Sequence, residues 1–367
     1  MMTSVLENLL HDEALTEEPL AVAKTIPSAW YADPAFHALD RDAVMARTWQ
    51  YFGPASRVKE HGDFMSDFIA GNPVVVIRDK EGELKAYFNV CKHRGGPLAM
   101  EECGNSKVLQ CKYHGWTYLL DGSLRGVPRF DRTELFDKKD FGLDALAVRE
   151  WQGMIFVCLE PHEAPPFEEV IAGIEERIAP MILSELTFDQ RDRYAVKANW
   201  KVYVDNYLEG YHIPLVHPDL MSVLDFRDYK TDTMEHYSLQ YSPFKDEENI
   251  YGSPDQQAFY YFVYPNIMFN ILPGRLQVNR VDATAHNACS TVFDYYYLTP
   301  DSARIEQDRL FSDQVQAEDI DICERVQAGL ESRAYDRGRF SYDLEGGVHH
   351  FQQCLKRSYR RARNGAI

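Results

Sequence analysis

The amino-acid sequence predicts an α+β protein with two domains behind a helical leader. The chain has 367 residues, more than one small core usually needs. Residues 46–160 contain short β-rich runs separated by glycine, Asp-Gly and proline turns. Residues 161–367 combine helical periodicity with aromatic and β-branched strand segments. These observations predict a small all-β domain followed by an α+β domain, with residues 1–45 as the leader.

The leader is acidic and helix-prone, and the β domain after it contains apolar runs such as PVVVIRD and GMIFVCLE. Asp121-Gly122 lies between two apolar stretches and predicts a tight hairpin. The segment 161–169, PHEAPPFEE, is rich in proline and acidic residues. We therefore place the boundary between the two domains there.

The second domain is predicted to alternate between helices and a run of strands. One helix is expected from Trp200 to about Tyr211, and two more near 312–331 and 347–362. Between them, YYFVYPNIMFNIL, RLQVNRVDA and ACSTVFDYYYLT have the composition of strands. Antiparallel strands flanked by helices are typical of an α+β domain.

Charge and hydropathy exclude several classes of function. Lys and Arg number 39 and Asp and Glu 57, which gives a net charge of −18 and disfavours nucleic-acid binding. The mean hydropathy is −0.41, and no apolar run approaches the ~18 residues of a membrane span. The acidic N-terminus lacks the basic start of a signal peptide, so we expect a cytoplasmic protein. Seven widely spaced cysteines argue against a disulfide framework.

Two short segments each carry one cysteine and one histidine. The pattern is Cys91-x-His93, then 17 residues, then Cys111-x-x-His114. Zinc accepts the same ligand types, but zinc fingers usually place both cysteines in one arm and a helix after it. Here each arm has one of each ligand within a glycine-containing loop. That arrangement suits a [2Fe–2S] cluster with two thiolates on one iron and two imidazoles on the other.

A second constellation lies in 199–218, NWKVYVDNYLEGYHIPLVHP. Asp205, Glu209 and His212 are spaced to share one helical face. His217 follows Pro214, which is expected to distort or end the helix and let the second histidine turn back toward the first. The opposite face is predicted to be a buried stripe of Trp200, Val204, Leu208, Tyr211 and Leu215.

His212 and His217 need only one carboxylate to form a 2-His-1-carboxylate triad, which leaves positions open on Fe(II) for O2. The alternative is a solvated helix face with two incidental histidines. The acidic residues nearby, the break between the histidines and the upstream cluster motif all favour the iron site.

Both constellations resemble motifs of the Rieske non-heme iron oxygenases. CKHRGGPL…CKYHGW is similar to the Rieske motif, and NWK…DN…E-x-x-H-x4-H to the mononuclear-iron motif. The resemblance implies Cys91 and Cys111 on the inner iron and His93 and His114 on the outer iron. It also implies a Rieske domain followed by a catalytic domain of helix-grip type, with one Fe(II) in each subunit.

The resemblance places the third iron ligand on a downstream helix, for which the candidate is 312–330. Asp319 falls within its predicted apolar stripe, and a carboxylate there must be paired or bound to metal. Asp321 is the second choice, and Asp321 and Glu318 are expected to lie at the side and reach solvent. A buried salt bridge from Asp319 to an arginine is the alternative. The stripe consists of Val315, Ile322, Val326 and Leu330.

In the family that these motifs resemble, the acidic residue three positions before the first iron histidine bridges that histidine to a Rieske histidine of the neighbouring subunit. Glu209 occupies this position. Asp205 is the rival for the bridge, and we expect it to support the site instead. The resemblance also implies a homotrimer and a separate flavin-dependent reductase or ferredoxin that delivers electrons from NADH or NADPH. No G-x-G-x-x-G fingerprint is present in this chain.

The N-terminal and NYLEGYH segments resemble the branch with choline, carnitine and betaine monooxygenases, which implies hydroxylation or oxidative demethylation of a quaternary ammonium compound. Aromatic runs could supply cation–π faces for it. One alternative is a ring-hydroxylating dioxygenase for an aromatic acid held by Arg275 or Arg280. A different class is a non-catalytic zinc-bearing binding module. The aromatic runs are Tyr260, Tyr261, Phe262 and Tyr264, and Tyr295, Tyr296 and Tyr297.

Overall fold

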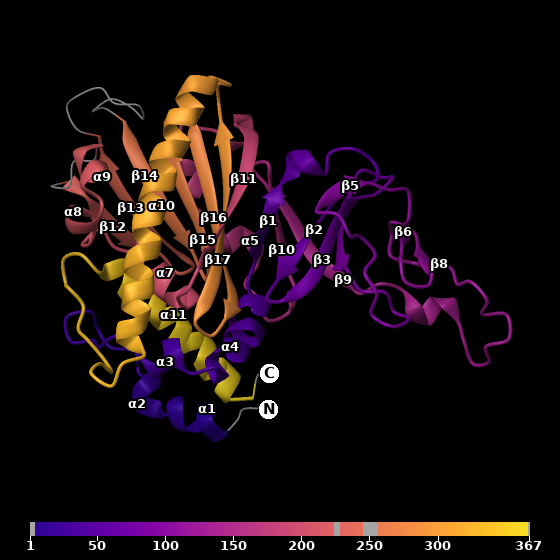
Figure 1. Cartoon of the computed structure of the whole chain (residues 1–367), viewed down its shortest axis with the longest axis horizontal. Coiled ribbons are helices and arrows are strands. Elements are labelled where there is room, and N and C mark those ends of the chain that lie inside the picture. The colour runs from indigo at the N-terminus through magenta and orange to yellow at the C-terminus, as the bar shows by residue number, and fades with distance from the viewer. Residues whose placement is uncertain (1–3, 224–227, 245–255, 366–367) are drawn as a thin grey trace. The chain divides into compact units, whose positions relative to one another are not determined.

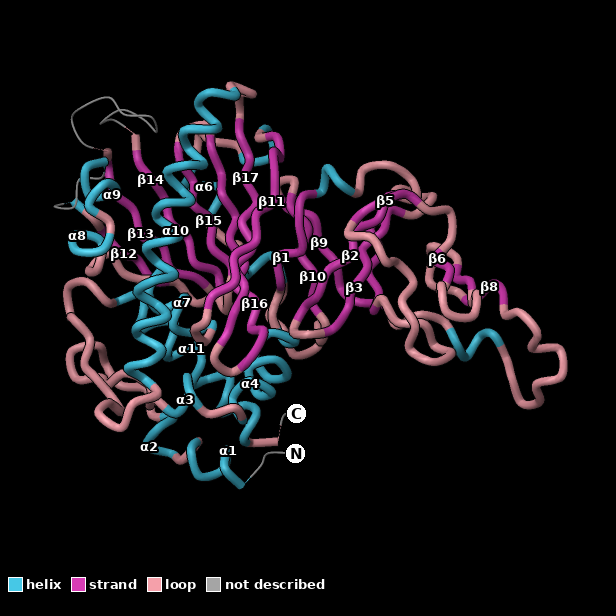
Figure 2. The backbone as a smooth tube through the Cα atoms, viewed as in Figure 1, coloured by secondary structure: helices cyan, strands magenta, loops and turns pink. Residues whose placement is uncertain are grey.

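The computed structural model describes residues 4–223, 228–244 and 256–365. It divides into two compact units, one of Ala46–Pro165 and one that combines Met1–Met45 with Pro166–Ile367. The first unit is all-β and the second has an antiparallel sheet with helices, so the predicted α+β class is confirmed (Figures 1 and 2). Within the described ranges, no helix combines the length and apolar character needed to span a bilayer.

The all-β unit contains a seven-stranded antiparallel sheet in the order β1-β10-β9-β4-β3-β2-β5 and a three-stranded sheet β6-β7-β8. Strand β3 explains why PVVVI is apolar without alternation. Val74 and Val76 belong to one buried cluster, whereas Val75 and Ile77 belong to another that includes Cys91 and Cys111. Both faces of this strand are therefore covered. The strands are β1 (Gln50–Pro54), β2 (Asp63–Ile69), β3 (Asn72–Arg78), β4 (Leu84–Phe88), β5 (Cys103–Asn105), β6 (Leu109–Gln110), β7 (Thr117–Tyr118), β8 (Leu124–Gly126), β9 (Ala145–Trp151) and β10 (Met154–Cys158).

The other unit is built on a seven-stranded antiparallel sheet in the order β11-β17-β16-β15-β14-β13-β12. The long helix α10 (Ser302–Leu330) runs along one face of this sheet, with α7 (Trp200–Tyr207) and α11 (Gly346–Arg363) beside it (Figure 1). The strands are β11 (Thr187–Val196), β12 (Lys230–Thr233), β13 (Tyr237–Pro243), β14 (Gln257–Val263), β15 (Ile267–Leu272), β16 (Arg275–Ala285) and β17 (Ala288–Tyr297).

Short helices complete this unit. Those of the N-terminal segment are α1 (Ser4–Leu9), α2 (Asp12–Leu15), α3 (Ala29–Ala32) and α4 (Ala35–Leu39), followed by a π-helical turn, Asp40–Val44. Next to the sheet lie α5 (Phe167–Val170), α6 (Ile174–Ile178), α8 (Ile213–Val216) and α9 (Pro218–Val223).

The predicted apolar stripe on the helix near 312–331 is wrong. Helix α10 begins ten residues earlier, where Asp301 caps it by accepting from the backbone N–H of Ala303 at 3.2 Å. Val326 is 44% exposed. The face that is buried is mainly polar, because its side chains form hydrogen bonds to the sheet and to α7. Its members are Asp308, Ser312, Gln316, Cys323 and Gln327.

The predicted stripe on the helix that begins at Trp200 holds only for its first half. Helix α7 ends at Tyr207, and Leu208 is its C-cap. Beyond that point the chain leaves the helix, so Tyr211 is 58% exposed and Leu215 is 89% exposed. Pro214 does not end a helix as expected; it lies in the first turn of α8, where a proline is tolerated.

The N-terminal segment is anchored beneath α7 by a buried ion pair. Asp40 and Lys201 have fully buried side chains, and their charged atoms lie 2.5 Å apart. Asp40 also accepts from Trp200 Nε1 at 2.8 Å and from the Tyr359 hydroxyl. A buried carboxylate is stable only with such partners. The ion pair therefore ties the N-terminal segment, α7 and α11 together.

Replacing Lys201 by Met should destabilise the protein, because Asp40 would remain buried without its counter-charge. We expect the free energy of unfolding to fall by about 3–5 kcal/mol, measured by urea titration followed by circular dichroism. Arg325→Met is the matched control, since Arg325 and Asp321 form a solvent-exposed pair whose loss should barely change stability. Equal effects of the two substitutions would contradict this account.

Candidate active site and metal centres

The two Cys-His arms form loops with the same backbone hydrogen-bond pattern. Cys91 N–H donates to Gly96 O at 2.8 Å, and Gly95 N–H donates to Cys91 O at 2.9 Å. The second arm repeats this, with Cys111 N–H donating to Trp116 O at 2.8 Å and Gly115 N–H to Cys111 O at 3.0 Å. Both loops need a left-handed glycine, Gly95 at φ +71° and Gly115 at φ +76°.

The donor atoms of these loops fit a [2Fe–2S] cluster. The rings of His93 and His114 lie 4.7 Å apart between centroids, and Trp116 stacks on His93 at 4.9 Å. His93 Nδ1 is buried and, among the described residues, has no hydrogen-bond partner, as expected for a metal ligand. The Tyr118 hydroxyl lies 3.4 Å from Cys91 Sγ.

Gly96 keeps the two arms close. A Cβ atom at this position would lie 2.8 Å from Cys111 Sγ and 3.1 Å from Tyr113 Cβ, closer than side chains tolerate. Glycine is therefore required here by close approach between the loops, not only by a turn. The sequence-predicted residues Cys91, His93, Cys111 and His114 thus lie on two adjoining loops of one unit.

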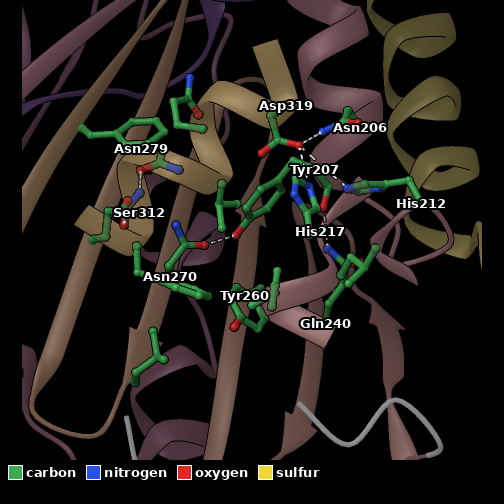
Figure 3. Close-up of a pocket in the computed structure, with 18 of the residues that line it drawn as sticks. Asn206, Tyr207, His212, His217, Gln240, Tyr260, Asn270, Asn279, Ser312 and Asp319 are labelled. Carbon is green, nitrogen blue, oxygen red and sulfur yellow. Dashed lines mark hydrogen bonds and ion pairs between the residues drawn. The ribbon is translucent and has the colours of Figure 1, made fainter. Parts of the chain in front are cut away.

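The second constellation brings His212, His217 and Asp319 into one group, whose ligand atoms lie within 4.8 Å of one another. Asp319 Oδ1 is 3.0 Å from His217 Nε2 and 3.8 Å from His212 Nε2. His212 and His217 flank α8, as its N-cap and C-cap, and Asp319 comes from the polar face of α10 (Figure 3). This group fits a mononuclear iron with two histidines and one carboxylate.

Each histidine of this group is held by a second carboxylate on its other nitrogen. Glu209 Oε1 lies 2.7 Å from His212 Nδ1, and Glu318 Oε2 lies 2.7 Å from His217 Nδ1. A carboxylate there takes the Nδ1–H and leaves the Nε2 lone pair for metal. Glu318 reaches solvent as expected, with 27% of its side chain exposed, but it also contacts His217, a role that the sequence did not indicate. Burial alone would lower the pKa of His217, but Asp319 and Glu318 outweigh it and raise that pKa.

The remaining carboxylates lie elsewhere. Asp321 is exposed and pairs with Arg325 at 2.8 Å, so it does not join the histidines. Asp319 accepts from Asn206 Nδ2 at 2.6 Å, a partner that the sequence did not single out. Asp205 is buried away from the histidines, where it accepts from the Tyr31 hydroxyl and from Gln352. Burial raises the pKa of Asp205 to about 7.

A cavity of about 150 Å³ opens beside the iron triad (Figure 3). Of the aromatic runs considered above, Tyr260 lines it, whereas Tyr261 is buried and is not among its described lining residues. Arg275 lines the cavity but pairs with Asp308 at 2.7 Å, whereas Arg280 is not among its described lining residues. Most of its aromatic walls come from residues that the sequence did not single out, because isolated aromatics resemble core residues. They include Tyr203, Tyr207, Tyr229, Phe244, Phe293 and Phe311.

Comparison with known protein families gives two matches. Residues 48–140 match the Rieske [2Fe-2S] domain, and residues 183–361 match the ring hydroxylating alpha subunit (catalytic domain). The first match contains both Cys-His arms, and the second contains the iron triad and the cavity.

Curated relatives and solved structures agree with these families. The chain is 36% identical to a chloroplastic choline monooxygenase from Arabidopsis thaliana over 353 residues, 92% of this chain and 83% of the relative. It is 28% identical to the carnitine monooxygenase oxygenase subunit of Escherichia coli, over 97% of this chain and all of the relative. A solved quaternary ammonium Rieske monooxygenase, CntA, superimposes with a TM-score of 0.85 at 27% identity, covering 94% of this chain and 99% of that one.

Asp319→Ala should remove the mononuclear iron and leave the cluster in place. We expect iron to fall from about three to about two atoms per chain, with acid-labile sulfide and the visible absorbance of the cluster unchanged. Asp321→Ala is the control on the same helix, and it should retain all the iron. A third iron retained by the Asp319 variant would show that another group completes the triad.

Proposed function

Because the chain belongs to the Rieske non-heme iron oxygenases, as an alpha subunit related to the choline and carnitine monooxygenases, we propose that it oxidises a small quaternary ammonium compound. The reaction would be a monooxygenation, by hydroxylation or oxidative demethylation, with O2 and electrons from a separate reductase. The observation that supports it best is the aromatic cavity next to the His212, His217 and Asp319 group.

The chain's residues have distinct roles in this proposal. Cys91, Cys111, His93 and His114 would hold a [2Fe–2S] cluster, and the triad would hold one Fe(II). When bound, the cluster would relay electrons and the iron would activate O2 beside the substrate. The aromatic walls would exclude water from the reacting carbon and position it, and Glu209 and Glu318 would keep both imidazoles oriented.

The cavity favours a cation over an anion. Ring faces attract a quaternary ammonium. An aromatic acid would need a cation able to take its carboxylate, but the guanidinium of Arg275 is already balanced by Asp308 at 2.7 Å. The net charge of −18 would also draw a cationic substrate toward the protein. A zinc-bearing binding module would account for neither the second metal group nor the cavity.

We further propose that the active form is a homotrimer in which Glu209 bridges two subunits. Within the chain, Glu209 accepts from His212 Nδ1 through Oε1 and from the backbone N–H of His212 at 3.1 Å through Oε2. A carboxylate oxygen can accept a second hydrogen bond, so Oε1 retains capacity for a cluster histidine of a neighbouring subunit. Electrons from NADH or NADPH would then reach the iron of one subunit from the cluster of the next.

A substrate screen tests the proposed chemistry. With a reductase and NADH, choline, carnitine or glycine betaine should stimulate O2 uptake and yield a product that mass spectrometry identifies as oxygenated or dealkylated. Benzoate, an aromatic acid, should cause no product-coupled uptake, because it has no cationic group for the aromatic faces and Arg275 is already paired with Asp308. Turnover of benzoate without turnover of any quaternary ammonium compound would favour the aromatic-acid alternative.

Glu209→Gln should keep both metal centres loaded and lower steady-state turnover by roughly 100-fold. The reason is that the neutral amide of glutamine cannot accept hydrogen bonds from two histidines as the carboxylate does. Reoxidation of the reduced cluster by O2 and substrate, followed by its visible absorbance, should slow in parallel. Iron content is the control for the local role of Glu209 in holding His212. Normal product yield from a pre-reduced variant in a single turnover would exclude the bridge.

A further inference from the structure

A row of hydrogen-bonded polar side chains runs along β16 and lines the cavity. Arg275, Gln277 and Asn279 alternate along the strand, so they project from one face of the sheet, and all three line the cavity. Arg275 donates to Asp308 Oδ2 at 2.7 Å and to Gln277 Oε1 at 2.6 Å. Gln277 Nε2 donates to Asn279 Oδ1 at 2.8 Å. We call Asp308, Arg275, Gln277 and Asn279 the amide relay.

The ion pair at the start of the amide relay fixes the direction of every bond in it. A carboxylate only accepts and a guanidinium only donates. Gln277 must therefore turn its carbonyl oxygen toward Arg275, and the Ser312 hydroxyl donates to the same oxygen at 3.2 Å. The nitrogen of Gln277 is then the donor to Asn279. As a result, Asn279 has its oxygen inside the relay and its NH2 group at the free end.

The NH2 group of Asn279 has no hydrogen-bond partner within residues 4–223, 228–244 and 256–365. Asn279 is only 3% exposed and lines the cavity, so its unpaired NH2 group is a donor that the cavity offers to a ligand. Asn270 repeats the arrangement on the neighbouring strand, where it is the partner of Gln277. Its oxygen accepts from the Tyr207 hydroxyl at 2.8 Å, so its nitrogen is also left toward the cavity.

The cavity therefore offers two kinds of surface. Tyr207, Tyr229 and Tyr260 contribute aromatic rings that suit a cation, whereas Asn270 and Asn279 contribute amide N–H donors that suit an oxygen acceptor. In Figure 3, Asn279 lies at the left of the view and His212 at the right, with Tyr207 between them. A small molecule with a cationic group and an oxygen at separate ends would match both surfaces.

We propose that Asn279 is a specificity-determining residue that donates a hydrogen bond to an oxygen of the substrate, at the end remote from the quaternary ammonium group. The proposal rests on the proposed function, since it assumes that the cationic group occupies the aromatic surface. A hydroxyl or a carboxylate oxygen has the required chemistry. Asp308 balances Arg275, so the relay presents neutral donors, and a hydroxyl fits them without burying an anion.

Three ligands of similar size test the proposal: choline, glycine betaine and n-propyltrimethylammonium, which carries a methyl group in place of the choline hydroxyl. Their dissociation constants for the iron-loaded enzyme are measured by titration calorimetry, and kcat/KM is measured alongside. Choline should bind about 10-fold more tightly than the propyl compound, the effect of one well-made hydrogen bond. Asn279→Leu should bring this ratio close to one by weakening choline alone. A preference for betaine that Asn279→Leu removes would identify a carboxylate as the acceptor.

Two further variants keep the test decisive. Gln277→Met removes the hydrogen-bonded link between Arg275 and Asn279, so the side-chain amide of Asn279 can rotate. The preference for choline over n-propyltrimethylammonium should then fall partway, and this result does not depend on whether Asn279→Leu folds. Asn105→Leu is the matched control: it removes an exposed amide that bonds His61 and Asp63 in the other compact unit, and it should leave the ratio unchanged.

Two outcomes would overturn the inference in distinguishable ways. If the wild-type enzyme binds none of the three ligands, the proposed function fails and the role of Asn279 falls with it. If the enzyme binds them without preference, or if the preference survives both Asn279→Leu and Gln277→Met, the proposed function stands and only the role of Asn279 is wrong.

Discussion

Two consecutive carboxylates on α10 hold opposite nitrogens of a single imidazole, and the candidate iron site depends on this contact. Glu318 lies 2.7 Å from Nδ1 of His217 and Asp319 lies 3.0 Å from Nε2. The ring is therefore fixed in place before any metal binds, with the nitrogen that faces Asp319 directed at the metal position. Because both acids come from one rigid helix, the geometry of the site is set by how α10 packs on the sheet.

That packing is polar, which is unusual for a long helix that covers a sheet. Gln316 accepts from the Tyr203 hydroxyl at 2.5 Å and donates to Thr291 at 3.1 Å, which links α10 to both α7 and β17. Hydrogen bonds constrain direction as well as distance, so the rotation of α10 about its axis is more narrowly defined than apolar contacts would make it. Asp319, Glu318 and part of the cavity wall share this helix.

The sequence predicted those features of the molecule whose residues lie close together in the chain. The two Cys-His arms and the His212–His217 pair were found from spacing alone, and their loops lie together in the structure as expected. The third ligand, Asp319, was chosen because a carboxylate on a buried stripe needs a partner, although the stripe itself was assigned to the wrong residues. Its true neighbours are polar, and apolar periodicity cannot detect a polar inward face. The roles of Asn206 and Glu318 were missed for a related reason: their partners, Asp319 and His217, lie far away in the chain.

The contacts between the N-terminal segment and α7 make the enzyme sensitive to proteolysis of that segment. Asp40 neutralises Lys201 on α7, and the Tyr31 hydroxyl donates to Asp205 on the same helix. Proteolytic trimming of the first forty or so residues would strip both partners from α7, only a few residues before Glu209 and His212. An enzyme cleaved in this region during extraction or storage would keep the visible absorbance of its cluster, because the cluster loops belong to a separate compact unit. The same enzyme would still lose oxygenase activity.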